Sequence, residues 1–117
     1  MNNKGGRVFH LTDTQYAYLL GRNMEFKGGG ISTHAYYEFK NMLELQRFER
    51  ALNDVIAHHG MLRTIILPSG MHKELSAVPY YHMEFTDFCQ CTEEEIQQEI
   101  LKKRQKYSHY VFSTDQW

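Results

Sequence analysis

The chain has 117 residues, of which 42% are hydrophobic and 14% aromatic, and its 13 basic residues nearly balance its 14 acidic ones. Such a chain is long enough for one ordinary domain, and it is too hydrophobic to be a disordered segment. The balanced charge gives no electrostatic attraction for nucleic acid or for an anionic membrane, so neither is expected as a partner. No stretch approaches the roughly 18 apolar residues of a membrane span, and the N-terminus lacks an apolar signal core.

The two cysteines, Cys89 and Cys91, lie so close in the chain that a disulfide between them would be strained. Nothing else in the sequence indicates an oxidising compartment. We therefore expect free thiols and a cytoplasmic protein.

The first elements follow from capping and turn residues. Residues 1–10 are expected to form a loose leader. Thr12 and Gln15 fit a capping box, in which each side chain satisfies a backbone N–H of the first helical turn. A short helix is therefore predicted to follow and to end near Gly21, before the glycines at 28–30 interrupt regular structure.

Alternation and helical spacing predict the middle of the chain. Residues 34–39 alternate around Tyr and Phe, which is typical of a strand. The apolar residues of 44–58 recur at helical spacing, so a helix is predicted there, ending before Gly60. The β-branched run at 62–67 predicts a strand. The solvent-exposed (wet) face of the predicted helix is expected to carry four charged residues: Arg47, Glu49, Arg50 and Asp54.

A turn at 68–70 is predicted to lead into a returning strand at 72–75. Residues 81–88 alternate again and predict another strand. Thr92 and Glu95 form a second capping box, so a helix should begin there.

The aromatic tail at 107–117 is expected to be a further extended segment. Taken together, the order helix, strand, helix, three strands and helix predicts an α/β or two-layer α+β fold.

Three segments in a fixed order are the most informative. The first, at 11–22, reads L-x-x-x-Q-x-A-Y-x-x-G-R, and the second, at 29–39, reads G-G-x-x-x-H-x-Y-x-E-F. The third, at 58–64, reads H-H-x-x-L-R-T, and the chain ends with S-H-x-x-x-x-T-D-x-W at 108–117. The motif residues of the three segments are Gln15, Tyr18, Gly21, Arg22, Gly29, Gly30, His34, Tyr36, Glu38, His59, Leu62 and Arg63.

These segments resemble the start of the condensation domains of nonribosomal peptide synthetases, and the first two resemble the heterocyclization subclass specifically. Two positions depart from the family pattern, because His10 stands where proline is usual and His58 where arginine is usual. The resemblance covers residues 11–117.

The resemblance implies that residues 11–117 form part of the N-terminal lobe of a condensation-domain fold, which is similar to chloramphenicol acetyltransferase. A domain of this subclass joins a carrier-bound acyl group to Cys, Ser or Thr and closes the product to a thiazoline or oxazoline. Its substrates arrive on the phosphopantetheine of carrier-protein domains. Those domains and the rest of the synthetase are therefore the implied partners, and no metal or nucleotide cofactor is expected. The motif residues would be structural or line the substrate tunnel.

The family's catalytic signature, H-H-x-x-x-D or D-x-x-x-x-D, is missing from the chain. Arg63 stands where the aspartate after His58-His59 would have to be. No two aspartates have the spacing of the second form; they are Asp13, Asp54, Asp87 and Asp115. The resemblance implies that Arg63 pairs with the signature aspartate. Without that acid, Arg63 is expected to be solvated or to have found a substitute acid, and it is predicted not to be catalytic.

Other features admit a functional interpretation, but a structural one is favoured for each. The histidines and cysteines match no zinc spacing, and the glycines at 28–30 lack the preceding strand that a phosphate loop requires. The aromatic residues of 34–39 lack the interleaved basic residues that base stacking needs, so core packing is predicted. His34 and Glu38 would lie on one side of the predicted strand, where acid–base chemistry is conceivable. Because no nucleophile is nearby, an internal hydrogen bond is favoured.

Three hypotheses remain open. In the first, the chain is an inactive fragment of a heterocyclization domain. In the second, it is a non-catalytic interaction module that binds a carrier protein or a synthetase partner. In the third, it is a fragment of an ordinary condensation domain that makes only amides. If the chain is a truncated lobe, strand edges left without neighbours predict dimerisation or strand exchange at high concentration.

Overall fold

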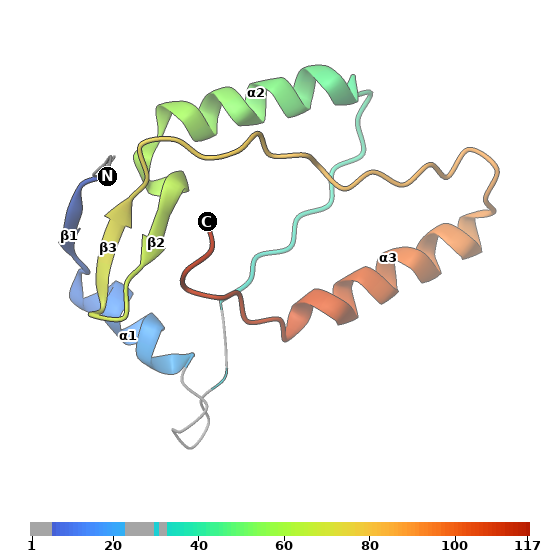
Figure 1. Ribbon diagram of the computed structural model, residues 1–117. Coiled ribbons are helices and arrows are strands. Elements are labelled where there is room, and N and C mark those ends of the chain that lie inside the picture. Colours follow the sequence, from blue (N-terminus) through green and yellow to red (C-terminus); the bar gives the residue numbers. More distant parts are fainter. Residues whose placement is uncertain (1–5, 23–29, 31–32) are drawn as a thin grey trace. The chain divides into compact units, whose positions relative to one another are not determined.

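The computed structural model describes residues 6–22, 30 and 33–117. The chain divides into two compact units, one built from residues 1–17, 40–83 and 112–117 and the other from 18–39 and 84–111. Within the described residues, three α-helices, one 3-10 helix and three strands give a small α+β structure (Figure 1). In chain order these are β1 (Val8–His10), α1 (Asp13–Gly21), α2 (Leu45–His58), η1 (Gly60–Arg63), β2 (Thr64–Ile66), β3 (Met71–Glu74) and α3 (Glu93–Ser108).

The first unit is organised around an antiparallel sheet with the strand order β1-β3-β2. His72 in the central strand lies opposite Phe9 on one side and Ile66 on the other. The predicted turn between β2 and β3 is confirmed, because Gly70 N–H donates to the carbonyl of Leu67 at 2.8 Å. Gly70 has a φ of 74°, in the left-handed region that only glycine occupies without strain.

The helix predicted at 44–58 is confirmed as α2, and its apolar spacing turns one face toward the rest of the unit. Among the residues that the structure describes, only Ile56 on α2 and His72 on β3 are buried, at 8% and 6% exposure. Other apolar side chains of α2 remain in water, as Phe48 at 44% and Val55 at 45% show. The packing that holds this unit together is therefore thin.

The second unit contains α3, and its predicted capping box is confirmed. Glu95 N–H donates to Thr92 Oγ1 at 3.3 Å, and Thr92 N–H donates to Glu95 Oε2 at 2.7 Å. The hydrogen bond from the Thr92 backbone, reinforced by the Thr92 hydroxyl, lowers the pKa of the Glu95 carboxyl. Glu93 and Glu94 share this first turn, where the helix dipole favours negative charge.

Replacing Thr92 with alanine is expected to destabilise α3 by about 1 kcal/mol, the usual effect of losing a cap. The helical signal in circular dichroism during urea titration would measure this loss. Because the Glu95 pKa is lowered in the folded state, its contribution is present above the unfolded pKa and is lost as pH falls through the folded pKa. The wild-type chain should therefore lose stability in acid more steeply than Glu95→Gln, which has no carboxyl to titrate at this position. Equal acid sensitivity in the two proteins would contradict this prediction.

Two predicted strands are not formed. The described residues at 34–39 and 81–88 contain no strand, although both alternate as strands do. Alternation shows which residues share a face, but a strand also needs a hydrogen-bonded neighbour, and no described segment pairs with either one. The core packing predicted for the aromatic residues of 34–39 is also wrong, since Tyr37 and Phe39 are 75% and 80% exposed.

Boundaries of other predicted elements also differ. The strand predicted at 62–67 is formed only at Thr64–Ile66, because Leu62 and Arg63 belong to η1. Val8–His10 were expected to belong to a loose leader, yet they form β1 and pair with β3. Three residues are too few to show alternation, and their partner lies more than 60 residues further on, so no local pattern announces this strand. The tail predicted as extended from 107 is helical through Ser108, and one of its later residues, Thr114, accepts a 2.8 Å hydrogen bond from Ile66 N–H.

In the parts of the chain that the structure describes, every helix is too short or too polar to cross a membrane.

Candidate functional site

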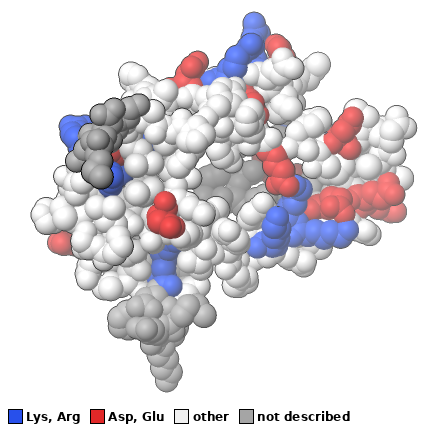
Figure 2. Space-filling view, viewed as in Figure 1, with Lys and Arg blue, Asp and Glu red and all other residues white. Residues whose placement is uncertain are grey.

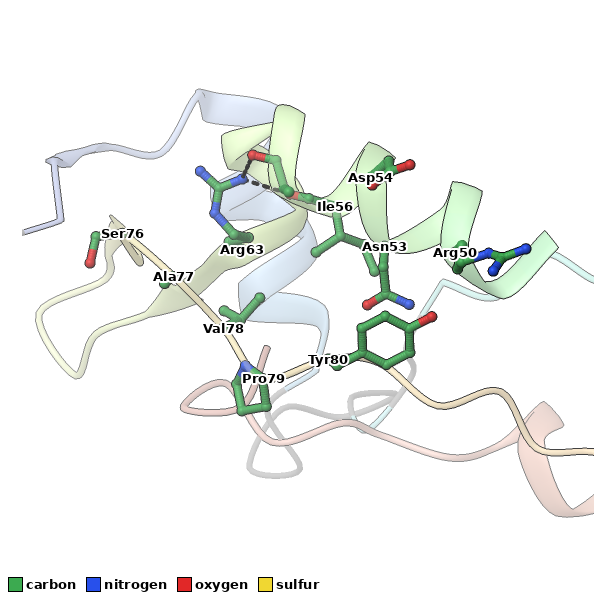
Figure 3. Close-up of a pocket in the computed structure, with 11 residues that line it drawn as sticks. Arg50, Asn53, Asp54, Ile56, Arg63, Ser76, Ala77, Val78, Pro79 and Tyr80 are labelled. Carbon is green, nitrogen blue, oxygen red and sulfur yellow. Dashed lines mark hydrogen bonds between the residues drawn. The ribbon is translucent and has the colours of Figure 1, made fainter. Parts of the chain in front are cut away.

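Arg63 is the motif residue that the structure places most firmly. It ends η1, directly before β2, and its side chain is only 11% exposed. Its Nη1 donates to the carbonyls of Ile56 and Ala57, both at 2.6 Å, near the C-terminal end of α2 (Figure 3). Its Nε donates to the carbonyl of Leu75 at 3.1 Å. One guanidinium therefore joins the end of α2 to the end of β3.

Glu74 is the acid that pairs with Arg63. Its Oε1 lies 3.3 Å from Arg63 Nη2, and its Oε2 lies 3.3 Å from Arg7 Nη2. Arg63 was expected either to be solvated or to pair with a substitute acid. Glu74 is that substitute acid. A sequence pattern does not identify Glu74 as this acid, because it follows His72 and Lys73 in a short strand with no motif around it.

A hollow of about 520 Å³ opens beside Arg63, between α2 and residues 76–80 (Figure 3). Arg50, Asn53 and Asp54 line it from α2, and Tyr80 lines it from the opposite segment. The lining therefore holds two cations and one carboxylate, but none of the described contacts joins them into an acid–base pair.

Asn53 holds the segment that follows β3. Its Nδ2 donates to the carbonyl of Tyr81 at 2.8 Å, and its Oδ1 accepts from Tyr81 N–H at 2.7 Å. One turn earlier in α2, Glu49 Oε2 accepts from Met83 N–H at 2.8 Å. Glu49 was assigned to the wet face of the helix, and this is wrong, because its side chain is 20% exposed and bound to backbone. Backbone N–H groups that have no strand partner need other acceptors, and here side chains of α2 supply them. The helical periodicity of the sequence does not reveal such contacts.

Replacing Asn53 with aspartate is expected to destabilise the first unit by about 1–2 kcal/mol. Aspartate keeps an acceptor for Tyr81 N–H but leaves the Tyr81 carbonyl facing a second acceptor. Asn53→Ser serves as the comparison, since it removes both bonds without adding charge. Chemical denaturation would give both values; an aspartate variant as stable as wild type would contradict the assignment.

The second motif segment lies in the other unit, along α3. His34, Ala35 and Tyr36 line a groove of about 670 Å³ together with α3 residues, including Leu101 and Tyr107. The Nε2 of His34 lies 2.6 Å from the carbonyl oxygen of Tyr110. The internal hydrogen bond predicted for His34 is therefore found.

Glu38 is not the partner of His34 that an acid–base site would need. It accepts a 3.1 Å hydrogen bond from the hydroxyl of Tyr36 instead. Arg104 lies over the Tyr36 ring, 4.7 Å from its centroid. Partial removal from water, together with the hydrogen bond to Glu38, raises the pKa of Tyr36. Tyr36 therefore stays a neutral hydrogen-bond donor at neutral pH.

The other motif residues have structural or exposed positions. Gln15 completes the predicted capping box, because Thr12 N–H donates to its Oε1 at 2.9 Å. Tyr18 on α1 is 60% exposed, and Leu62 in η1 is 48% exposed. Four more are placed as follows: Gly21 ends α1, Arg22 follows it half-buried, Gly30 has a φ of 78°, and His59 caps α2 with its ring 5.1 Å from that of His58. Gly29 lies outside the described residues.

The two cysteines are free thiols, and both are exposed. The hydrogen bond with the Asp87 carboxylate raises the pKa of the Cys89 thiol and lowers that of Asp87. Since the thiolate is the nucleophile, this contact makes Cys89 less reactive. Nowhere in residues 6–22, 30 and 33–117 do three His, Cys, Asp or Glu side chains gather as a metal site would require.

Charges on α3 are arranged in pairs of opposite sign. On the face drawn in Figure 2, acidic and basic side chains lie next to each other over this helix. Lys103 Nζ lies 2.9 Å from Glu84 Oε1. The hydrogen bond between them lowers the pKa of Glu84 and raises that of Lys103, so both stay charged across neutral pH. This pattern favours a balanced surface over a binding site for a polyanion.

Comparison with known proteins identifies what the chain is similar to. No protein-family model matches it. Bacitracin synthase 1 of Bacillus licheniformis is 38% identical over 110 residues, which are 94% of this chain and 2% of that protein. Pyochelin synthetase PchF of Pseudomonas aeruginosa is 30% identical over 111 residues, covering 93% of this chain and 6% of the synthetase.

A solved structure agrees with the sequence comparison. The EpoB NRPS cyclization-docking bidomain from Sorangium cellulosum matches with a TM-score of 0.83 and 27% identity, over 100% of this chain and 25% of that one. The chain resembles one segment of a nonribosomal peptide synthetase. A second crystal form of the bidomain gives a TM-score of 0.81 and 29% identity over 97% of this chain.

The chain spans only a small part of each synthetase that it matches, at most 6% of the two named by sequence. The resemblance to nonribosomal peptide synthetases that the motifs indicated is therefore confirmed, and so is the α+β fold of a segment of such a protein. The heterocyclization subclass and the position of the segment within a lobe belong to the proposal below.

Proposed function

We propose that residues 11–117 are part of the N-terminal lobe of a heterocyclization domain in a nonribosomal peptide synthetase. The observation that carries this proposal is the match of the whole chain to the EpoB cyclization-docking bidomain at a TM-score of 0.83. The G-G-x-x-x-H-x-Y-x-E-F segment at 29–39 supports the subclass. The chloramphenicol-acetyltransferase-like lobe is part of the same proposal.

The chemistry proposed for the parent domain has two steps. The amine of a carrier-bound Cys, Ser or Thr attacks the thioester of a carrier-bound acyl group, which forms an amide and releases the carrier thiol. The side-chain thiol or hydroxyl then adds to the new amide carbonyl, and loss of water closes the thiazoline or oxazoline. Both substrates would be held on phosphopantetheine, so carrier-protein domains are the proposed partners in a cytoplasmic assembly.

This chain is proposed to contribute framework rather than catalytic groups. Its strongest polar cluster, Arg63 with Glu74, is satisfied internally and joins α2 to β3. Ser108 Oγ lies 2.9 Å from His109 Nδ1, but the Ser108 hydroxyl also lies 3.1 Å from the carbonyl oxygen of Gln105, and the Cys89 thiol has a raised pKa. The chain alone is therefore expected to form neither amide nor heterocycle.

The test begins with the reading frame beyond Trp117. We expect it to continue and to contain the paired aspartates of D-x-x-x-x-D. The longer protein, supplied with a carrier-bound acyl donor and carrier-bound cysteine, should release a product one water lighter than the amide, as mass spectrometry would detect. The uncyclised amide alone would support an ordinary condensation domain. A stop codon directly after Trp117 would overturn the proposal in favour of a carrier-binding module.

Dimerisation of this chain through its strand edges stays a prediction. In the described sheet β1 and β2 are the edge strands, and β2 donates one backbone hydrogen bond to the C-terminal segment, through Ile66. The outer edge of β1 is therefore the expected site of pairing between copies. Light scattering should show dimers as concentration rises into the millimolar range, and a strict monomer there would contradict this expectation.

A further inference from the structure

The turn that precedes α3 carries both cysteines of the chain. Cys91 N–H donates to the carbonyl of Phe88 at 3.0 Å, which closes the turn, and Cys89 N–H donates to Asp87 Oδ1 at 2.8 Å. The next residue, Thr92, is fixed by the reciprocal bonds of the capping box. Hydrogen bonds on both sides therefore hold the two cysteines, one residue apart, on a short ordered stretch.

The two thiols are accessible and near each other. Both cysteines are free and exposed, so neither is committed to a disulfide or to packing. The hydrogen bond with Asp87 is the main cause of the raised pKa of Cys89, and the charge of Cys91 adds to it. The two thiols therefore lie within electrostatic reach of each other, and a ligand from solution can contact both at once.

The spacing of the two cysteines suits a bridging ion better than a disulfide. A disulfide would bring the two sulfur atoms to about 2.05 Å and close a small, strained ring. An ion between two thiolates forms two bonds of about 2.3 Å, so the sulfur atoms can lie up to roughly 4.6 Å apart. The longer bridge relaxes the ring that strains a disulfide.

The number and type of ligands select the ion. A structural zinc site uses four ligands, and within the described residues no group of three His, Cys, Asp or Glu side chains is placed to hold an ion. That requirement does not apply to Cu(I), because thiolates are the soft ligands that this monovalent ion prefers and two of them can complete its coordination.

We propose that Cys89 and Cys91 form a two-coordinate dithiolate site for one Cu(I) ion. Each thiol gives up its proton on binding, so Cu(I) and two neutral thiols yield a complex of charge −1 and two protons. The positive end of α3 favours the added charge, whereas the carboxylates of Asp87 and of the first helical turn oppose it. Both effects are screened at an exposed site and are small beside two metal–thiolate bonds. The site includes none of the motif residues, so it is independent of the proposed function.

Competition for Cu(I) tests the proposal. The reduced 117-residue chain, kept free of oxygen, should withdraw one ion per chain from the coloured Cu(I) complex of bicinchoninate. Cys89→Ser and Cys91→Ser should each weaken binding by more than the roughly 10–100-fold that an outer-shell change causes, because each removes one of two ligands. Failure of the wild-type chain to withdraw the ion, or unchanged affinity in either serine variant, would overturn the proposal.

Gln90→Ala is the matched control, because it changes the residue between the two cysteines and leaves both sulfur atoms in place. It should bind Cu(I) as tightly as the wild-type chain does. The helical circular dichroism signal should be the same in all four proteins, since both cysteines are exposed. Weakening by Gln90→Ala as large as that caused by the serine variants would overturn the assignment of the two thiols as the ligands.

Two measurements on the wild-type chain need no substitution. X-ray absorption at the copper edge should show two sulfur neighbours, and bound Cu(I) should protect both thiols from alkylation by iodoacetamide. A nitrogen neighbour, or protection of one cysteine alone, would overturn the proposal. At micromolar chain concentration the loaded protein should stay monomeric in light scattering. A dimer with half an ion per chain would overturn the proposal in favour of copper shared between copies.

Discussion

Replacing Arg63 with alanine is expected to lower the free energy of unfolding by about 3–5 kcal/mol, the effect of breaking a buried ion pair from one side. The guanidinium is 11% exposed and binds three backbone carbonyls besides Glu74. Its loss would leave the carbonyls at the end of α2 without this donor and Glu74 with Arg7 alone. Urea denaturation followed by circular dichroism would measure the change.

Arg7 provides the matched control, because it contacts the other oxygen of the same carboxylate while 86% exposed. Arg7→Ala should therefore change the unfolding free energy by only about 0–1 kcal/mol. Arg63→Lys should fall between the two, since lysine keeps the charge but cannot reach the carbonyls and Glu74 together. If Arg7→Ala destabilised the chain as much as Arg63→Ala, the backbone bonds of Arg63 would not be the cause.

Replacing Gly6 with alanine is expected to detach β1 from the sheet and to destabilise the first unit by about 3 kcal/mol. A Cβ on Gly6 would lie 1.4 Å from the carbonyl oxygen of Glu74, and backbone has no rotamer with which to escape. The displaced chain would lose the 2.8 Å bond from Glu74 N–H to the carbonyl of Arg7. Loss of amide protection in β1, together with a lower urea midpoint, would show the detachment.

Gly21→Ala is the control for that experiment. A Cβ there would meet nothing within 4 Å, and the residue ends a helix. Alanine should therefore stabilise α1 by up to about 1 kcal/mol. Similar destabilisation by both substitutions would mean that neither the clash at Gly6 nor the open space at Gly21 is as described.

Local signals in the sequence predict much of this fold. The two capping boxes and the apolar spacing of 44–58 predict helices because capping and amphipathicity depend on residues within a turn or two of one another. The turn at 68–70 is predictable for the same reason, since glycine alone accepts its φ without strain. The motif residue Arg63 was identified by resemblance, and its need for an acid follows from the cost of an unpaired buried charge.

What could not be predicted depends on residues far apart in the chain. β1 exists because β3 lies next to it, and residues 34–39 and 81–88 lack any such neighbour among the described residues. Glu74 becomes the partner of Arg63 only once β2 and β3 have paired. Asn53 and Glu49 bind the backbone of Tyr81 and Met83 across about 30 residues of chain, and no helical pattern encodes that contact.

The thin packing around Ile56 and His72 matters for anyone who wishes to recombine synthetases. Burial of apolar surface stabilises a fold by about 25 cal/mol per Å², and the described residues bury one apolar side chain. Most of the stability of a parent domain would then have to arise where this segment meets other polypeptide. In a chimera whose junction lies inside residues 6–117 or at their border, one of the two polypeptides that make each of these contacts would be replaced and the other would be kept. Junctions in a linker well away from this segment should give better-folded hybrids, and soluble yield across a series of junctions would show it.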